Sequence, residues 1–318
     1  MKKVIIILAS LCCISLLISL TIPKVYENEK PSKEGKKAYS FLIVSDWGWN
    51  GFYHQQEVAD QMGKTADSIH ANFIVSCGDN FQIQGVASTQ DPLWNSNYEN
   101  IYKALSLQVD WYPVLGNHDY KGSPQAEIDY STISRRWRLT DRYYSFAKRI
   151  NDSISARFIF LDTSPLVDEY WKRAEGYPEL TKQDSAKQLK WLKDVLVNSK
   201  EQWILVFGHH PIYSASNTHG NTKEMIEKVK PLLEKYHAQF YFCGHDHDLQ
   251  HLHEKSGHID YIVTGTGGEP RPCNSDSLTV FSGSEPAFTK VSFKTDSIQV
   301  SFINSKGKSI YQFGRRYK

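Results

Sequence analysis

The chain has 318 residues, of which 40% are hydrophobic and 23% are charged, as in an ordinary globular protein with a sizeable core. A formal net charge of +2 argues against the broad basic surface that nucleic-acid binding requires, so no nucleic-acid binding is expected. The composition therefore points to a small or diffusely distributed substrate.

The amino-terminal segment has the pattern of an export signal. Two lysines precede an almost unbroken apolar run at residues 4–22, and charge returns directly afterwards. This pattern is typical of a cleaved signal peptide or of an uncleaved membrane anchor, so residues 1–22 are assigned to one or the other. Lipid attachment at Cys12 or Cys13 is a third, weaker alternative. All three alternatives predict export of the domain, which would then be periplasmic, secreted, or membrane-anchored and facing outside.

Residues 23–37 are charged, proline-containing and aperiodic, which predicts a linker and leaves residues 38–318 as the folded domain. Short β-rich runs then alternate with amphipathic segments. In chain order, strands are predicted at 41–45, 73–77, 111–115, 157–161, 203–207 and 240–243, and helices at 57–70, 93–105, 183–197 and 223–235. Residues 258–311 contain short runs typical of hairpins. This order predicts a largely parallel sheet with a second, mixed sheet of late hairpins packed on it.

Three cysteines lie outside the export segment: Cys77, Cys243 and Cys273. An odd number in an exported chain indicates no closed disulfide framework. Cys77 and Cys243 end apolar strands, so a role as small buried core residues is favoured over thiolate ligation of a metal.

Five predicted strands end in polar loops. In chain order the loops read SDWG (45–48), GDNF (78–81), GNHD (116–119), GHHP (208–211) and GHDH (244–247). Ligand sites in α/β sheets lie at the carboxyl ends of strands, so the loops are expected to converge. Each loop alone is weak evidence, because an Asp after a strand is more often a turn or helix cap. Together, their Asp, Asn and His side chains predict a shared site for Mg, Mn, Fe or Zn.

The order of the loops resembles that of the calcineurin-like metallophosphoesterases, and within them the tartrate-resistant (type 5) purple acid phosphatases. The resemblance runs from about Tyr39 to the carboxyl end and includes YSTISRRW (130–137), QLKWLK (188–193) and CGHDHDLQ (243–250). It implies an α/β fold, the metallo-dependent phosphatase fold: a four-layer α/β/β/α sandwich with two mixed β-sheets. It also implies a monomer that binds a small phosphorylated substrate.

The activity implied by the resemblance is hydrolysis of phosphate monoesters, with in-line attack by a metal-bound hydroxide at a dinuclear metal centre. Two alternatives stay open. One is a phosphodiesterase or nucleotidase of the same fold, and the other is a non-catalytic metal-binding scaffold protein whose centre has decayed.

The resemblance places the metal ligands residue by residue. The implied ligands of the first metal are Asp46, Asp79 and His247; those of the second metal, which Asp79 bridges to the first, are Asn117, His209 and His245. The implied metal ions are Fe paired with Fe, Zn or Mn, and the exact pair stays open.

The resemblance also indicates residues that act on the substrate. His118 follows the implied ligand Asn117 and is expected to stabilise or protonate the leaving oxygen. Asp119 is expected either to orient His118 or to shape the turn. His219 resembles a second substrate-side histidine, with a solvated loop histidine as the alternative. His210 is expected not to bind metal, because the subtype usually has an aromatic residue there.

One position departs from the purple acid phosphatases. They place a tyrosine directly after GDNF, whose phenolate binds ferric iron, whereas this chain has Gln82. Other metallophosphoesterases carry a histidine two residues after the first Asp, whereas this chain has Gly48. Gln82 is therefore the candidate neutral fourth ligand of the first metal. We expect no tyrosinate charge-transfer band, a more exchangeable metal and less preference for Fe(III).

Two further segments carry expectations. Residues 164–180 form a long aromatic and charged loop, which is interpreted either as a lid over the site or as a surface excursion. The stretch FCGHDHDLQHLH (242–253) contains four histidines, and the resemblance uses two of them. His251 and His253 alternate with Leu252, so they are expected on the polar face of a strand without metal.

Overall fold

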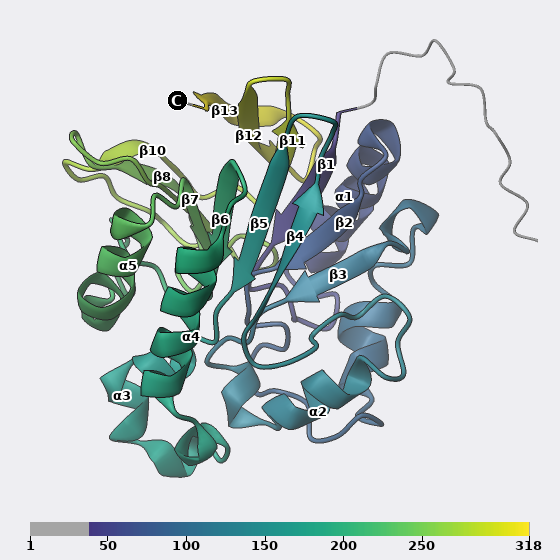
Figure 1. Ribbon diagram of the computed structural model, residues 1–318. Helices are drawn as coiled ribbons and strands as arrows, with labels where there is room; N and C mark the ends of the chain where they lie inside the picture. Colours follow the sequence, from purple (N-terminus) through teal and green to yellow (C-terminus); the bar gives the residue numbers. More distant parts are fainter. Residues whose placement is uncertain (1–37, 318) are drawn as a thin grey trace, which may run out of the picture. The chain divides into compact units, whose positions relative to one another are not determined.

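The computed structural model describes residues 38–317, which form two β-sheets with helices on their outer sides (Figure 1). The signal or anchor assigned to residues 1–22 and the linker assigned to residues 23–37 lie outside the described residues. Within the described part, no helix is both long enough and apolar enough to span a bilayer.

The first sheet has six strands in the order β13-β12-β11-β1-β2-β3. Its strands are β1 (Ser40–Val44), β2 (Phe73–Ser76), β3 (Asp110–Pro113), β11 (Ala287–Phe293), β12 (Ser297–Asn304) and β13 (Ser309–Arg316). The first three are parallel to one another, and the last three form an antiparallel meander that pairs with the edge of β1. The sheet is therefore mixed.

The second sheet has seven strands in the order β10-β8-β9-β7-β6-β5-β4. Its strands are β4 (Tyr144–Arg149), β5 (Ser155–Phe160), β6 (Trp203–Phe207), β7 (Phe240–Cys243), β8 (Leu249–His253), β9 (Asp260–Thr264) and β10 (Thr279–Gly283). The prediction that the late hairpins form a sheet of their own is wrong. They extend both sheets, because each sheet offered a free edge and local sequence does not say which edge a hairpin joins.

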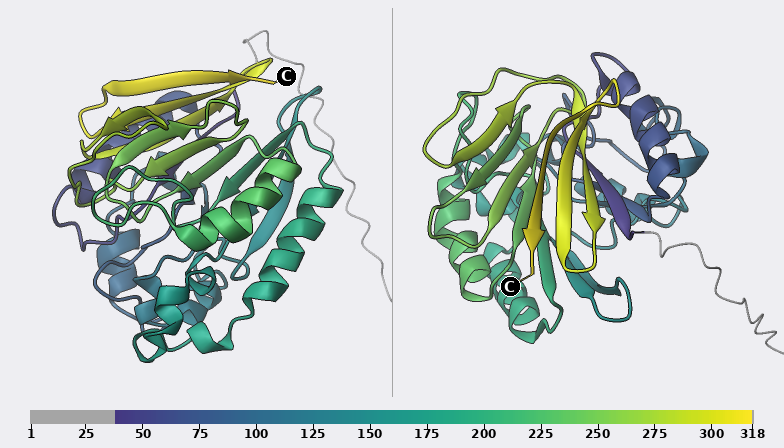
Figure 2. Two further views of the ribbon diagram at one scale, coloured as in Figure 1. Left: turned by 90° about the vertical axis from the view of Figure 1, so that its left-hand side faces the viewer. Right: turned by 90° about the horizontal axis from the view of Figure 1, so that it is seen from above.

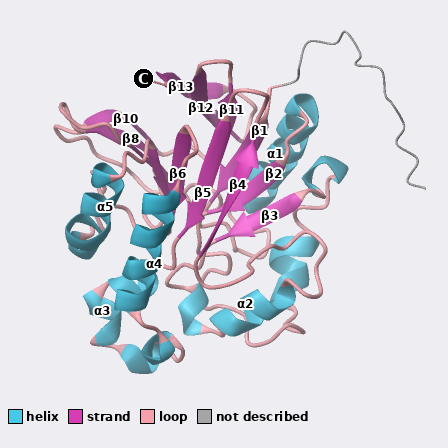
Figure 3. Ribbon diagram, viewed as in Figure 1, coloured by secondary structure: helices cyan, strands magenta, loops and turns pink. Residues whose placement is uncertain are grey.

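Helix α1 (Gln55–Ile69) covers the outer face of the first sheet, and α4 (Ser185–Asn198) and α5 (Lys230–Lys235) cover that of the second (Figure 3). The short helices α2 (Pro124–Tyr130) and α3 (Asp168–Trp171) lie near the ends of the strands. The prediction of an α-helix at 93–105 is wrong, because this segment forms one π-helical turn at Trp94–Glu99 and a 3₁₀ turn at Leu105–Leu107. The π-helical turn has the sequence WNSNYE, and its Asn and Ser residues favour turns over helix interiors.

The core consists of three apolar layers separated by the two sheets. Alternate side chains of β1 point to opposite faces: Phe41 and Ile43 face the second sheet, and Leu42 and Val44 lie in the cluster that contains the apolar side of α1. A third cluster packs the far face of the second sheet against α4 and α5. The predicted four-layer α/β/β/α sandwich is therefore confirmed, and Figure 2 shows helices on both outer sides of the sheets.

The cysteines of the described residues are Cys77, Cys243 and Cys273, and all three are free thiols. Cys77 lies in the layer between the sheets and Cys243 in the layer beneath α4 and α5, and both are fully buried. The interpretation of these two as small core residues is confirmed.

Candidate metal centre

The five polar loops meet at one edge of the two sheets. The strands that precede them run parallel within each sheet, so the loops follow the carboxyl ends of β1, β2, β3, β6 and β7. Hydrogen bonds join loops from opposite sheets. The Nδ1–H of His209 donates to the carbonyl oxygen of Cys77 (2.9 Å), and the backbone N–H of His245 donates to Oδ2 of Asp46 (3.1 Å).

The backbone of these loops is strained and closely packed. Asp46, Asp79 and His245 have φ angles of 58°, 48° and 69°, in the left-handed region that costs a non-glycine residue roughly 1–3 kcal/mol. A Cβ at Gly116 would lie 2.2 Å from Oδ1 of Asp79, and one at Gly244 would lie 2.3 Å from Oδ2 of Asp46. Only glycine lets the backbone approach the carboxylates this closely.

Asp46 and His247 face each other at the first position. Asp46 is fully buried, its Oδ1 has no hydrogen-bond partner among the described residues, and Nε2 of His247 lies 3.5 Å from that oxygen. The Nδ1–H of His247 donates to the carbonyl oxygen of Glu269 (2.9 Å), which leaves Nε2 free to bind a metal ion. Burial raises the pKa of Asp46 well above its ordinary value, so its ionised form requires a nearby cation.

Asp79 lies between the first and second positions. Its Oδ1 accepts a hydrogen bond from the backbone N–H of His118 (2.8 Å) and is 3.4 Å from Nε2 of His209. Its Oδ2 accepts a hydrogen bond from Nε2 of Gln82 (3.4 Å). Burial would raise the pKa of Asp79, but the charge on His209 holds it well below its ordinary value. The two oxygens thus face different neighbours, as bridging requires.

Asn117, His209 and His245 converge at the second position. Oδ1 of Asn117 is 3.1 Å from Nε2 of His209 and 3.0 Å from Nδ1 of His245, and these two ring nitrogens are 3.3 Å apart. Ligands bound at about 2.0–2.2 Å to one tetrahedral ion have similar mutual separations. The three side chains are therefore arranged as ligands of a single metal.

The donor set fits a pair of divalent or trivalent metal ions. Ligand atoms of Asp46, Asp79 and His209 all lie within 4.8 Å of one another. Burial lowers the pKa of His209, but the charge on Asp79 more than offsets this and raises it to about 9. A metal ion bound to the ring nitrogen of His209 would displace the proton from that nitrogen. The unpartnered oxygen of Asp46 and the clustered oxygen and nitrogen donors are those expected of metal ligands.

His118 lies beside the centre, whereas Asp119 points into the fold. Nε2 of His118 is 4.0 Å from Oδ2 of Asp79, its side chain is 27% exposed, and burial lowers its pKa. Asp119 accepts hydrogen bonds from the backbone N–H groups of Gly116 (2.7 Å), Asn80 (3.2 Å) and Phe81 (3.0 Å). These are the contacts expected of a residue that shapes the turn, and they clamp the GDNF loop to the GNHD loop.

No local sequence pattern indicates the network of hydrogen bonds behind this clamp. The side-chain amide of Asn80 donates to Asp119 (3.2 Å), to Oε2 of Glu127 (3.1 Å) and to the carbonyl oxygen of Val114 (3.0 Å). Ser76 donates to Oδ1 of Asn80 (2.5 Å). Asn80 therefore holds the GDNF loop, of which it and Asp79 are part, in position.

His219 lies over the second position. Its ring stacks on that of His245, with centroids 4.0 Å apart, and its backbone N–H donates to Oδ1 of Asp246 (3.1 Å). The buried carboxylate of Asp246 also accepts hydrogen bonds from Ser214 (2.6 Å) and the backbone of Gly220 (3.2 Å). Asp246, between the candidate ligands His245 and His247, thus holds the loop that carries His219.

His210 is held away from the ligand positions by two hydrogen bonds. Its Nδ1 is 2.8 Å from Oγ1 of Thr163, and its Nε2 is 2.7 Å from the hydroxyl of Tyr170. Tyr170 belongs to the loop at 164–180, and Arg142 forms an ion pair with Glu179 at the far end of that loop. The loop is therefore fixed to the body of the domain beside the centre.

Gln82 and Gly48 are the two positions at which the sequence departs from the families it resembles. Gln82 is buried, 5% exposed, and its amide contacts Asp79. A Cβ at Gly48 would lie 2.1 Å from the carbonyl oxygen of Asn80, so no side chain fits there. Position 48 therefore excludes a histidine, whereas Gln82 is placed beside Asp79 as a candidate additional donor.

Comparison with known proteins agrees with this fold and site. The family model for calcineurin-like phosphoesterases matches residues 39–249, which contain all five loops. Because the match covers more than half of the chain, the protein belongs to the calcineurin-like phosphoesterase family. Membership implies two metal ions.

The individual relatives are acid phosphatases. Tartrate-resistant acid phosphatase type 5 of Oryctolagus cuniculus is 33% identical over 86% of this chain and 89% of its own. Purple acid phosphatase 17 of Arabidopsis thaliana is 31% identical over 95% of this chain and 91% of its own. Among solved structures, "GAP50 the anchor in the inner membrane complex of Plasmodium" has a TM-score of 0.79 at 25% identity, covering 89% of this chain and 90% of that one. The relatives support a phosphoesterase of the purple acid phosphatase type.

Proposed function

We propose that the protein is an exported phosphatase with a dinuclear metal centre that hydrolyses phosphate monoesters. The observation that carries the proposal is the convergence of two ligand groups on Asp79, whose oxygens face His209 on one side and Gln82 on the other. The proposed ligands are Asp46, Asp79, Asn117, His209, His245 and His247. Fe paired with Fe, Zn or Mn fits this oxygen and nitrogen set. When bound, the pair supplies an activated water for in-line attack and holds the phosphate.

The remaining residues bind and orient the ester. His118 is placed to donate a proton or hydrogen bond to the leaving oxygen, because it lies beside Asp79 and is partly open to solvent. His219, stacked on His245, is placed to contact the phosphate from the opposite sheet. Asp119 acts through the backbone, by holding the loops that carry Asp79 and Asn117 together.

A non-catalytic scaffold is the second candidate function, and two observations favour it. Gln82 replaces the tyrosine of purple acid phosphatases, and one similar solved structure is described as an anchor of a membrane complex. The retained geometry of His118, Asn117 and Asp79 weighs against decay of the centre. A phosphodiesterase or nucleotidase of the same fold is the third candidate.

Turnover of a chromogenic monoester and a chromogenic diester separates these functions. Protein reconstituted in turn with Fe, Mn, Zn and Mg is expected to hydrolyse the monoester with the larger kcat/KM. A larger kcat/KM for the diester would favour the phosphodiesterase. No turnover of either substrate with any metal would contradict an enzymatic function and favour the non-catalytic scaffold.

Replacement of His118 by alanine tests its place in the reaction. We expect kcat for the monoester to fall by roughly 10²–10⁴-fold, the usual contribution of a positioned acid or base, while the metal content stays unchanged. His54→Ala is a matched control, since His54 is exposed and contacts Glu57 on α1. An effect of His118→Ala no larger than that of His54→Ala would remove His118 from the mechanism.

A further inference from the structure

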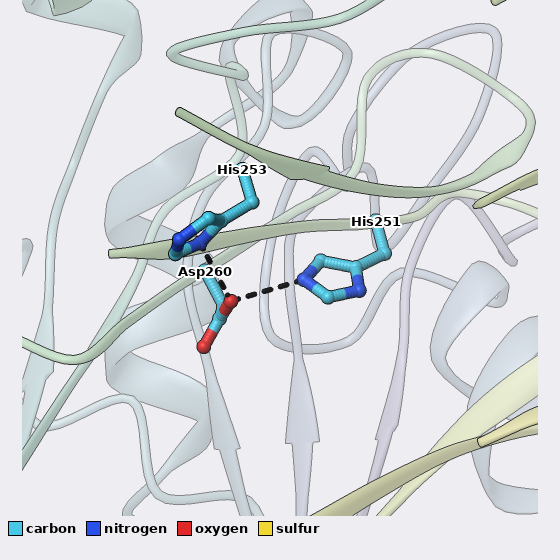
Figure 4. A group of neighbouring side chains, drawn as sticks. All are labelled: His251, His253 and Asp260. Atoms are coloured by element: carbon cyan, nitrogen blue, oxygen red, sulfur yellow. Dashed lines mark hydrogen bonds and ion pairs between the residues drawn. The ribbon is translucent and has the colours of Figure 1, made fainter. Parts of the chain in front are cut away.

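A second group of potential metal ligands lies on strands β8 and β9. His251 and His253 are on β8, Asp260 begins β9, and Figure 4 shows both imidazoles turned towards one carboxylate. The strands are antiparallel, with His253 directly opposite Asp260. Residues two apart on a strand share a face, so His251 reaches the same carboxylate from the diagonal position.

His251 and His253 share one face of β8, as their alternation with Leu252 predicted, but His251 is buried on that face. This residue is 4% exposed, and its ring stacks on Phe313 of β13, with centroids 4.0 Å apart. β13 belongs to the other sheet, so the histidine is enclosed between the two sheets. Alternation along one strand indicated its face correctly but not that the second sheet covers that face.

The ligand atoms are close enough to share one ion. Nε2 of His251 is 3.0 Å from Oδ1 of Asp260, and Nδ1 of His253 is 2.9 Å from the same oxygen. All three atoms lie within 4.8 Å of one another. A tetrahedral zinc ion bound at about 2.0–2.2 Å places its ligands about 3.3 Å apart, so shifts of roughly 0.3–0.4 Å would accommodate it.

The ring of His253 provides the most specific indication of a ligand. Its Nδ1 is shielded from solvent and makes no hydrogen bond within the described residues, although Asp260 is in contact with it. Buried polar atoms normally have a partner, and a metal ion would provide one for this nitrogen. The His253 side chain is 31% exposed overall, so a water molecule can reach the open fourth ligand position.

Residues of the other sheet orient the ligands from behind. The Nδ1 of His251 is 2.7 Å from the hydroxyl of Tyr311, a contact that fixes the ring and leaves Nε2 towards Asp260. Arg315 donates to Oδ2 of Asp260 (2.6 Å), so it occupies the oxygen that the histidines do not use. Burial raises the pKa of Asp260, but the hydrogen bond from His251 and the charge on Arg315 bring it below its ordinary value.

We propose that His251, His253 and Asp260 form a mononuclear site for a transition-metal ion, separate from the dinuclear centre. Two imidazoles, one carboxylate and an open position suit zinc, the common ion for such a ligand set. Because Tyr311 and Arg315 on β13 support these ligands, the bound ion ties the edges of the two sheets together.

Metal content tests the site directly. The full chain is loaded with zinc, desalted and measured by elemental analysis beside His253→Ala and the control His54→Ala. We expect His253→Ala to lose about one zinc ion per chain relative to the wild type. His54→Ala should lose none, because His54 is the partly exposed residue that precedes α1 and contacts Glu57. His253→Gln repeats the comparison if the alanine variant does not fold, which circular dichroism would show.

Two further readouts distinguish this site from the dinuclear centre. In cobalt-loaded protein, the wild-type minus His253→Ala difference spectrum should show a tetrahedral cobalt band that inorganic phosphate does not perturb. Zinc at about 100 times its Kd should raise the Tm of the wild type by roughly 5 °C more than that of His253→Ala. Equal zinc content and equal Tm shifts in the two proteins would overturn the site and leave an ion-pair network between the sheets.

Discussion

Replacing Asp79 by asparagine is expected to lower kcat for a phosphate monoester by about three orders of magnitude. Asp79 has one oxygen 3.4 Å from His209 and the other in contact with Gln82, and the proposed bridge would give each metal position one of these oxygens. An amide offers a single oxygen ligand and no charge. Losing the bridge removes several kcal/mol of transition-state stabilisation, and each 1.36 kcal/mol corresponds to a factor of ten in rate.

The measurement is steady-state hydrolysis of a chromogenic monoester by metal-reconstituted wild type and variant, with metal content determined on the same samples. Asp67→Asn is the matched control, because Asp67 is an exposed residue of α1. The control should retain wild-type kcat. A kcat for Asp79→Asn within about tenfold of the wild type would contradict the bridging role, since it would leave less than about 1.4 kcal/mol to the bridge.

The ligand loops could be predicted from the sequence because their signals are local. Each loop follows an apolar strand directly, and parallel strands end at the same edge, so Asp46 and His247 were expected to approach each other although 201 positions separate their numbers. The structure places their side chains 3.5 Å apart. The four-layer sandwich was implied by the family resemblance rather than by local signals. In the structure, β1 alternates between the two apolar layers that the sandwich requires.

The contacts that support the loops could not be predicted, because they join residues with no shared local pattern. Asn80 and Asp119 are 39 residues apart, and neither residue type indicates a partner. Tyr170 meets His210 only because the loop at 164–180 returns to the centre, 40 residues away. The sheet edge that each late hairpin joins likewise depends on tertiary packing between whole sheets, and not on local β-strand propensity.

Packing around Gly48 limits which residue can supply a fourth protein ligand at the proposed first metal position. A Cβ at Gly48 would collide with the backbone of Asn80, so the loop that carries Asp79 fills the space a histidine would need. The backbone N–H of Gln82 donates to the carbonyl oxygen of Gly48 (2.9 Å), which places the glutamine side chain next to Asp79. Any fourth protein ligand from these two loops therefore comes from position 82.

Gln82→Tyr is accordingly expected to turn an iron-loaded, colourless protein purple. The wild type should show no tyrosinate-to-iron band, because an amide oxygen is a neutral donor without the electron-rich phenolate. The variant places a phenolate beside Asp79 and should gain a visible charge-transfer band. It should also retain Fe(III) roughly 10–100-fold more tightly against a chelator, the range by which altered metal-site residues commonly change affinity.

Gln84→Tyr is the control for this experiment, because residue 84 is exposed two positions further along the same loop. It should remain colourless and release iron at the wild-type rate, so that colour depends on the position of the tyrosine rather than on its presence. A visible band in the iron-loaded wild type that survives replacement of Gln82 would show that another residue supplies the phenolate. A colourless Gln82→Tyr protein with a full complement of iron would show that side chain 82 does not reach the first metal. Either result would remove residue 82 from the proposed ligands of the first metal. Asp46, Asp79 and His247 would then be the proposed protein ligands of that metal.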